Sequence, residues 1–380
     1  MTTSVSLDGL RELAGFRAEN GCAISLYLNL DPSITPTAAD VATRVRSLLD
    51  NGSKSHGATR GDLAHEVRLG LRSDFERLQR FFQSEFQRDG AHGYAVFVAG
   101  LDNVWSPVPL PVAVSDTIRV ADDFLLAPLV PLVGRGEGAL VALVNREQGR
   151  VYALRGGRVE EIANKTEEAP RRHDQGGWSQ ANFQRHIDNL AQEHYRTVAE
   201  ELERHFRRLQ RPRVVVACPE EVRHEFAQML STEVQDAIIG WAAVAQHAGP
   251  TELREVVVPL LDRWRSERVN TCIERWQEEA GRGARAASGW SETLEAASDA
   301  RIDLLLYSEG VSRNAYRCPS CGRASADPGT CPLDGTMMEP RDDGLDLAVR
   351  LTLASGGEVL TVGERRDLDP VEGIGAILRF

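Results

Sequence analysis

Apolar residues follow two different spacings along this chain, and the change from one to the other predicts a mixed α/β protein. Short apolar runs predict strands at residues 23–30, 94–98, 139–144, 213–217 and 303–307. Stretches in which apolar residues recur every three or four positions predict helices at residues 63–86, 179–209, 220–230 and 345–355. Strands and helices that follow one another in this way are typical of a mainly parallel α/β sandwich.

Segments rich in glycine, proline and polar residues separate these elements. Residues 51–60 (NGSKSHGATR) predict a loop, and residues 105–112 are a proline-rich piece of the first domain. Ser291 stands before a helical stretch and is a predicted N-cap. The pattern divides the chain into three predicted domains, namely residues 1–130, 131–256 and 257–380.

Length and charge narrow the class of function. At ~100–200 residues per domain, 380 residues are too many for one ordinary domain. The formal net charge of −12 argues against general coating of nucleic acid, and neither DNA nor a membrane is an expected partner. No apolar run reaches the ~18 residues that span a bilayer, and the N-terminal sequence MTTSVSLDGLREL lacks a signal-peptide pattern. We therefore expect a cytoplasmic protein.

Three of the six cysteines cluster in residues 316–340. Cys318 and Cys321 form a Cys-x-x-Cys pair, and nine residues later Cys331 and Asp334 repeat the spacing with an aspartate in the last place. Two side chains at this spacing can bind the same metal ion, so the two pairs together can supply the four ligands of one tetrahedral ion. The four side chains are therefore candidate ligands of a structural zinc. The alternative is a degenerate ribbon that is held by packing without a metal. The remaining cysteines are expected to be core thiols: Cys22, Cys218 and Cys272.

A second candidate site is the Gly-Gly loop, residues 171–180 (RRHDQGGWSQ), which leads directly into the long predicted helix. Gly176 and Gly177 add no side-chain bulk, so the backbone there can approach a phosphate or an ester closely. The alternative is a solvated linker between a hairpin and a helix. Basic residues in and after the loop could bind RNA phosphates: Arg171, Arg172, His173 and Arg185.

The order of hairpin, basic Gly-Gly loop, long helix and VVVA strand resembles the middle domain of the class I release factors of eukaryotes and archaea. The final octapeptide GIGAILRF at residues 373–380 is very similar to a sequence in that family's third domain. The resemblance covers residues 131–380 well and the first domain weakly. It implies a three-domain release-factor-like α/β architecture with mixed sheets and a small zinc-ribbon-like insertion in the third domain, which is familiar from archaeal members. The variant Gly-Gly loop resembles the loops of bacterial release-factor-like relatives.

In that family the loop reaches the peptidyl-transferase centre, where a backbone N–H after the glycines stabilises the oxyanion and a glutamine restricts the pocket to water. Gly176 and Gly177 match the family's glycines, but Trp178 stands where the family has glutamine. Gln180, two residues later, is the candidate replacement, and Gln175 is a weaker one. The resemblance thus implies Gly176, Gly177, Trp178 and Gln180 as catalytic residues.

The resemblance leaves three functions open. The leading hypothesis is hydrolysis of peptidyl-tRNA on stalled ribosomes, with ribosomal RNA and peptidyl-tRNA as partners and a translational GTPase as a further one. The first domain has no Asn-Ile-Lys-Ser loop, so stop-codon reading is not expected. The second hypothesis is a non-catalytic hibernation factor that occupies the A site while Trp178 stacks on an RNA base. The third is an RNA-binding scaffold that does not enter the ribosome.

Overall fold

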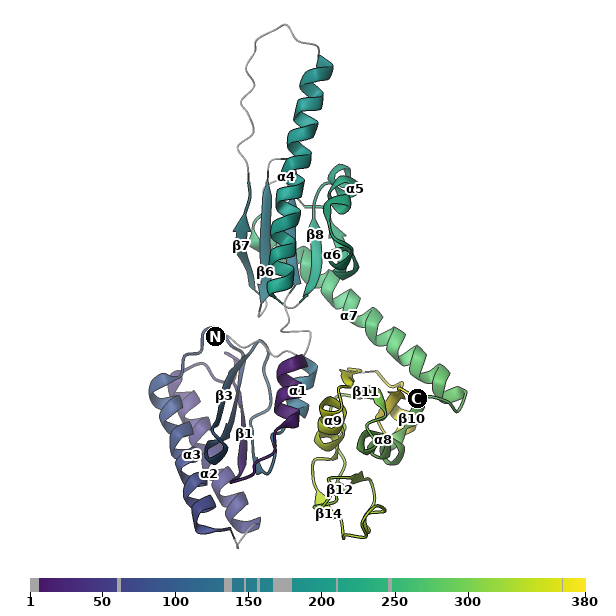
Figure 1. Ribbon diagram of the computed structural model, residues 1–380. Coiled ribbons are helices and arrows are strands. Elements are labelled where there is room, and N and C mark those ends of the chain that lie inside the picture. The colour runs from purple at the N-terminus through teal and green to yellow at the C-terminus, as the bar shows by residue number, and fades with distance from the viewer. Residues whose placement is uncertain are drawn as a thin grey trace. The chain divides into compact units, whose positions relative to one another are not determined.

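The computed structural model describes residues 7–59, 63–132, 139–146, 148–155, 158–166, 180–209, 211–244, 248–363 and 365–380. The chain forms two compact units (Figure 1). Unit 1 comprises an N-terminal segment, Met1–Gly136, and a C-terminal segment, Val269–Phe380, whereas unit 2 is Glu137–Arg268. The division into three domains stays a prediction. Among the described residues, no helix is both long enough and apolar enough to cross a membrane.

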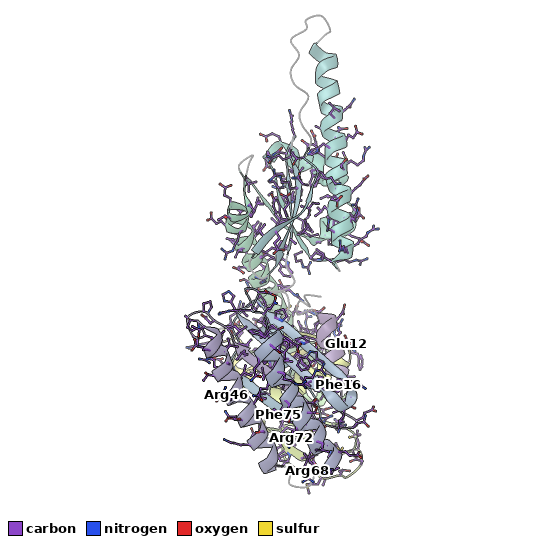
Figure 2. All side chains as sticks on the ribbon, turned by 90° about the vertical axis from the view of Figure 1, so that its left-hand side faces the viewer. Glu12, Phe16, Arg46, Arg68, Arg72 and Phe75 are labelled. Atoms are coloured by element: carbon purple, nitrogen blue, oxygen red, sulfur yellow. The ribbon has the colours of Figure 1, made fainter. Side chains whose placement is uncertain are left out.

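The N-terminal segment contains a four-stranded sheet of order β3-β2-β1-β4 in which every pair is antiparallel. Helices α2 and α3 cover one face, and their outer side carries Arg46, Arg68 and Arg72 while Phe75 packs against the core (Figure 2). The elements are α1 (Leu7–Gly15), β1 (Ala23–Asn29), α2 (Ala38–Thr59), α3 (His65–Arg80), a π-helical turn (Phe81–Glu85), β2 (Gly93–Ala99), a 3-10 turn (Gly100–Asp102), β3 (Val104–Leu110), β4 (Thr117–Ala121) and a 3-10 helix (Ala127–Leu132).

One prediction for this segment was wrong. The predicted loop at 51–60 is the last part of α2, which continues to Thr59. A Cβ at Gly52 would lie 2.8 Å from Cδ1 of Ile118 on β4, so the glycine allows the helix to pack close to this strand. Such tertiary packing stabilises the helix at residues whose intrinsic helix propensity is low. The proline-rich stretch is strand β3, which lies at the sheet edge where a missing N–H breaks no ladder.

The C-terminal segment contains a sheet of order β10-β16-β11-β15 and a small sheet of order β13-β12-β14. Helix α8 begins at Gly289 with Ser288 as its N-cap, so Ser291 lies inside the helix and its predicted capping role was wrong. Glu292 accepts the Ser288 N–H at 2.8 Å, which starts the helix earlier. The elements are β10 (Ala286–Ser288), α8 (Gly289–Ser298), β11 (Ile302–Tyr307), β12 (Ala315–Arg317), β13 (Ala324–Ser325), β14 (Glu339–Arg341), α9 (Gly344–Ala354), β15 (Glu358–Thr361), a 3-10 turn (Asp369–Val371) and β16 (Ile374–Leu378).

One hydrophobic core joins the two segments of unit 1. Tyr27 and Phe124 of the N-terminal segment belong to the same cluster as Trp290, Leu305 and Leu347 of the C-terminal segment. All five side chains are at most 3% exposed, so the cluster is dry. Because the two segments share a core, neither covers its own apolar face alone.

Unit 2 is built on a mixed sheet of order β7-β6-β5-β8-β9, antiparallel among β5, β6 and β7 and parallel among β5, β8 and β9. The mixed sheets that the resemblance implies are confirmed, whereas the expectation of a mainly parallel arrangement was wrong for unit 2, because β5, β6 and β7 follow one another closely along the chain and pair antiparallel. The elements are β5 (Ala139–Val144), β6 (Gly149–Arg155), β7 (Arg158–Asn164), α4 (Gln180–Arg208), β8 (Arg213–Ala217), α5 (Glu220–Met229), α6 (Thr232–Ala237), β9 (Ile238–Ala242) and α7 (Pro250–Gly281), which extends past Arg268 into unit 1.

Candidate functional site

The later turns of helix α4 are anchored on the unit 2 sheet. Tyr195, Val198, Leu202 and Phe206 are buried in one cluster with residues of β5, β6 and β8. The helix begins at Gln180 and its first turns extend beyond the sheet (Figure 1). His194 is the first residue of α4 described as buried. It follows Gln180 by fourteen positions, so the start of the helix lies about 21 Å from this anchored part.

The predicted catalytic and RNA-binding residues lie in the loop before that start and in the first turns of the helix. Gly176, Gly177 and Trp178 lie outside the described residues, as do the basic side chains of the loop, Arg171, Arg172 and His173. The backbones of Gln180 and Arg185 belong to the first turns of α4. The roles of these residues remain predictions.

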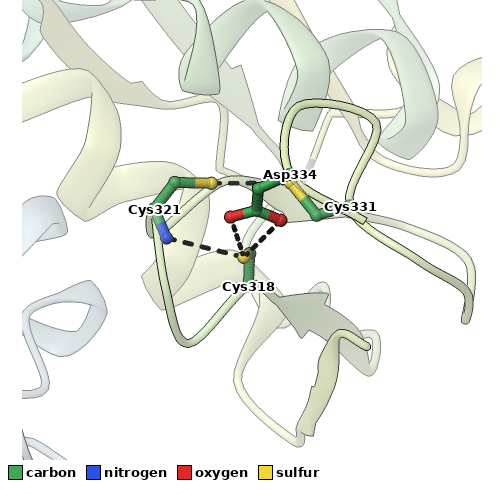
Figure 3. Close-up of side chains that lie close together, drawn as sticks. All are labelled: Cys318, Cys321, Cys331 and Asp334. Atoms are coloured by element: carbon green, nitrogen blue, oxygen red, sulfur yellow. Dashed lines mark hydrogen bonds between the residues drawn. The ribbon is translucent and has the colours of Figure 1, made fainter. Parts of the chain in front are cut away.

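The structure brings the four candidate metal ligands together in the insertion between β12 and β14 (Figure 3). One ligand atom from each of Cys318, Cys321, Cys331 and Asp334 can be chosen so that all lie within 4.8 Å of one another. Cys318 and Cys331 are buried, whereas Cys321 and Asp334 are exposed. This Cys3Asp cluster is thus open to solvent on one side.

The cluster is made of two turns with the same backbone geometry. The Gly322 N–H donates to the Cys318 carbonyl at 2.9 Å, and the Gly335 N–H donates to the Cys331 carbonyl at 2.9 Å. The two glycines have φ of +80° and +72°, a left-handed conformation that other residues adopt at a cost. Asp334 in the second turn therefore occupies the place that Cys321 has in the first.

The distances fit a tetrahedral ion. The Sγ atoms of Cys321 and Cys331 are 3.5 Å apart, and the Cys318 Sγ lies 3.5 and 3.7 Å from the two carboxylate oxygens of Asp334. Metal–sulfur bonds of about 2.3 Å and a metal–oxygen bond of about 2.0 Å would give ligand separations of roughly 3.8 and 3.5 Å. Three thiolates and one carboxylate form a donor set that zinc accepts.

Neighbouring groups shift the pKa values of three of the four candidate ligands. The Thr336 backbone N–H, 2.9 Å from Oδ1, lowers the pKa of Asp334 to about 2. The Arg323 backbone N–H lowers the pKa of Cys321. Burial raises the pKa of Cys331 to about 11, so this thiol needs a nearby cation to become a thiolate at neutral pH. A divalent metal would supply that charge.

The other cysteines are remote from this chemistry. Cys22 and Cys218 are buried as predicted, and burial raises the pKa of Cys218 to about 11. Cys272 on α7 is only half-buried. None of these three belongs to the Cys3Asp cluster.

Sequence reasoning missed the arginines beside the insertion. Arg317 and Arg341 pair with Asp122 and Asp123 of the N-terminal segment. The position of Arg317 directly before Cys318 is the one feature of the sequence that marks this arginine. Its partners Asp122 and Asp123 lie almost two hundred residues earlier, and no periodic pattern in the sequence predicts that pairing.

Comparisons with known proteins agree on one class. Residues 125–260 match the model of bacterial archaeo-eukaryotic release factor family 10. Peptide chain release factor subunit 1 of Archaeoglobus fulgidus is 27% identical, and the alignment covers 98% of this chain and 96% of that protein. The crystal structure of the archaeal translation termination factor aRF1 is similar at 19% identity, 99% and 98% coverage and a TM-score of 0.27. A model of ribosome-bound archaeal Pelota and ABCE1 gives 13% identity, 100% and 95% coverage and a TM-score of 0.43.

Proposed function

We propose that this chain, which is similar to release factors of the archaeo-eukaryotic class, binds the ribosome and hydrolyses peptidyl-tRNA on stalled complexes. The extended start of α4 is the observation that carries the proposal. A helix that is anchored about 21 Å from its first residue can carry a loop into a narrow RNA cavity while its own domain stays outside. Gln180 is that first residue, and the Gly-Gly loop directly precedes it.

The chemistry requires few groups from the protein. Gly176 and Gly177 would let the backbone approach the ester, and the backbone N–H of Trp178 would stabilise the negative charge that develops on the carbonyl oxygen. Gln180 would position the attacking water in place of the glutamine that the family has at the position of Trp178. Because Gln180 begins α4, the helix sets the position of its backbone.

The test is peptide release from defined stalled ribosomes. We expect release by the wild type, and losses of at least tenfold in Gly177→Ala and Gln180→Ala. Gln192→Ala is the matched control, because Gln192 is an exposed glutamine on the same helix. Equal release by Gln180→Ala and Gln192→Ala would refute the role of Gln180.

A hibernation factor is the second candidate, and Trp178 favours it because an indole stacks well on a base. The peptide-release assay distinguishes a hibernation factor from a hydrolase. A wild type that co-sediments with ribosomes and releases no peptide would be a hibernation factor. A wild type that does not co-sediment would refute both functions and leave the RNA-binding scaffold.

We also propose that the Cys3Asp cluster binds zinc in a structural role. All four positions would be filled by protein ligands, which leaves none for a substrate. Elemental analysis of purified protein should find about one zinc per chain, and Cys331→Ser should lose it while Cys272→Ser keeps it. Retention of zinc by Cys331→Ser would refute this site.

A further inference from the structure

Two neighbouring carboxylates of the N-terminal segment bind two arginines that flank the cysteine insertion. Nη1 of Arg317 lies 3.1 Å from Oδ2 of Asp123 and 3.4 Å from Oδ2 of Asp122. Nη1 and Nη2 of Arg341 lie 3.3 and 3.4 Å from Oδ1 of Asp122 and Oδ1 of Asp123. Each guanidinium therefore bridges both carboxylates. We call these four residues the aspartate–arginine bridge.

The bridge is largely removed from water. The side chains of Asp123, Arg317 and Arg341 are 3%, 14% and 18% exposed. Burial favours a higher pKa for Asp122, yet Arg317, Arg341 and Arg17 outweigh it and lower the pKa of this carboxyl. Asp122 is thus charged at neutral pH. Both acidic side chains depend on these arginines, because a buried anion without its partner is costly.

Both arginines of the bridge belong to the small sheet of the insertion. Arg317 is the last residue of β12 and precedes Cys318, and Arg341 is the last residue of β14. The two strands pair with each other, with Arg341 opposite Ala315. The position of both guanidinium groups therefore depends on whether the insertion is folded.

The insertion has little apolar core with which to fold. Its own cluster contains the buried residues Cys318, Cys331 and Met338, with Tyr316 partly buried against them. Two of the three buried residues are candidate metal ligands, and the three strands have two or three residues each. The small sheet adds only small side chains, Ala315, Ala324 and Ala326, to the shared core of unit 1. So few apolar contacts do not offset the conformational entropy of folding the insertion, so a bound metal would supply the remaining stabilisation.

We propose that the Cys3Asp cluster is a metal-dependent lock between the two segments of unit 1: bound metal folds the insertion and holds Arg317 and Arg341 against Asp122 and Asp123, and loss of metal releases this contact. The inference rests on the metal site proposed above. The small sheet contributes Ala315, Ala324 and Ala326 to the shared core, but the large side chains of that core, such as Tyr27, Phe124 and Trp290, lie outside the insertion. Arg350, which donates to the Ala14 carbonyl at 2.8 Å, also lies outside it. Metal loss therefore loosens the junction locally and leaves the segments folded.

Hydrogen exchange of the full chain without ribosomes tests the lock separately from peptide release. The amides of Leu126 and Ala127 donate across the junction to Oδ1 of Asp346 at 2.5 and 2.9 Å, so they report on it. Removing zinc with a strong chelator should raise their exchange at least tenfold, and added Zn²⁺ should reverse the change. Leu26 and Val96, which face each other in β1 and β2, should keep their exchange rates.

A second variant separates the bridge from folding of the insertion. The double variant Arg317→Gln/Arg341→Gln should keep its zinc and still show raised exchange at Leu126 and Ala127. Arg72→Gln, a change at an exposed arginine of the same unit, should behave like the wild type. Unchanged exchange at Leu126 and Ala127 after complete zinc removal would overturn the inference, and so would unchanged exchange in the double variant.

Discussion

Arg350 offers a quantitative test of how the two segments of unit 1 are held together. Its side chain is 7% exposed. Nη1 donates to the carbonyls of Ala14 and Phe16 at 2.8 and 3.1 Å, and Nη2 donates to the carbonyl of Phe124. Nε lies 3.4 Å from Oδ2 of Asp123. One guanidinium on α9 thus contacts three carbonyls and one carboxylate of the other segment.

Arg350→Ala removes all of these contacts at once. At about 1 kcal/mol for each buried acceptor that loses its donor, the three carbonyls account for about 3 kcal/mol. Asp123 keeps Arg119, Arg317 and Arg341, so its share is smaller than that of an ion left without a partner. We expect the free energy of unfolding of unit 1 to fall by about 3–5 kcal/mol, the range for breaking a buried pair.

Native-state hydrogen exchange measures this loss of unfolding free energy in unit 1, and amides of unit 2 serve as the control in the same experiment. Amides at the centre of β1 and β11 should lose roughly 100- to 3,000-fold protection, since about 1.4 kcal/mol corresponds to a factor of ten. Val141 and Val215, paired in β5 and β8 of unit 2, should be unaffected. A drop of less than 1 kcal/mol in unit 1 would refute the idea that Arg350 makes a large contribution to holding the segments together.

Three further predictions concern the metal site, helix packing and pH. Asp334→Cys completes a set of four thiolates and should raise zinc affinity at least tenfold in a chelator competition; weaker binding would contradict a ligand at this position. Gly52→Val places a side chain 2.8 Å from Cδ1 of Ile118 and should cost about 1–3 kcal/mol in urea unfolding, whereas Gly15→Val, with nothing within 4 Å, should cost less than half as much. The pKa of Asp122 is lowered from 3.8, so its stabilisation is complete above this pH and is lost as the pH falls through the lowered value. The protection factors of the junction amides, which compare each exchange rate with the intrinsic rate at the same pH, should fall below about pH 4 and stay constant from pH 5 to 7.

Local sequence determined most of the elements and the ligand spacing. The strands at residues 139–144 and 213–217 form as predicted, because apolar runs of this length bury both faces in a sheet. The two Cys-x-x-Cys-like pairs predicted four ligands that the structure brings together, because the turn geometry of such a pair is local and each turn has a glycine where φ is positive. The aspartate in the fourth place was also visible in the sequence.

Tertiary structure decided what depends on distant partners. The sequence read as a loop at 51–60 is helical because Gly52 lets α2 pack closely on β4, and the prolines of β3 are tolerated because that strand is at an edge. The strand order of the mixed sheets and the pairing of Asp122 and Asp123 with Arg317 and Arg341 also required the fold. The spacing of residues along a chain determines turns and amphipathic faces, because these depend on neighbouring residues. Burial of a helix and ion pairs between residues about two hundred positions apart depend on which elements pack against each other in the fold.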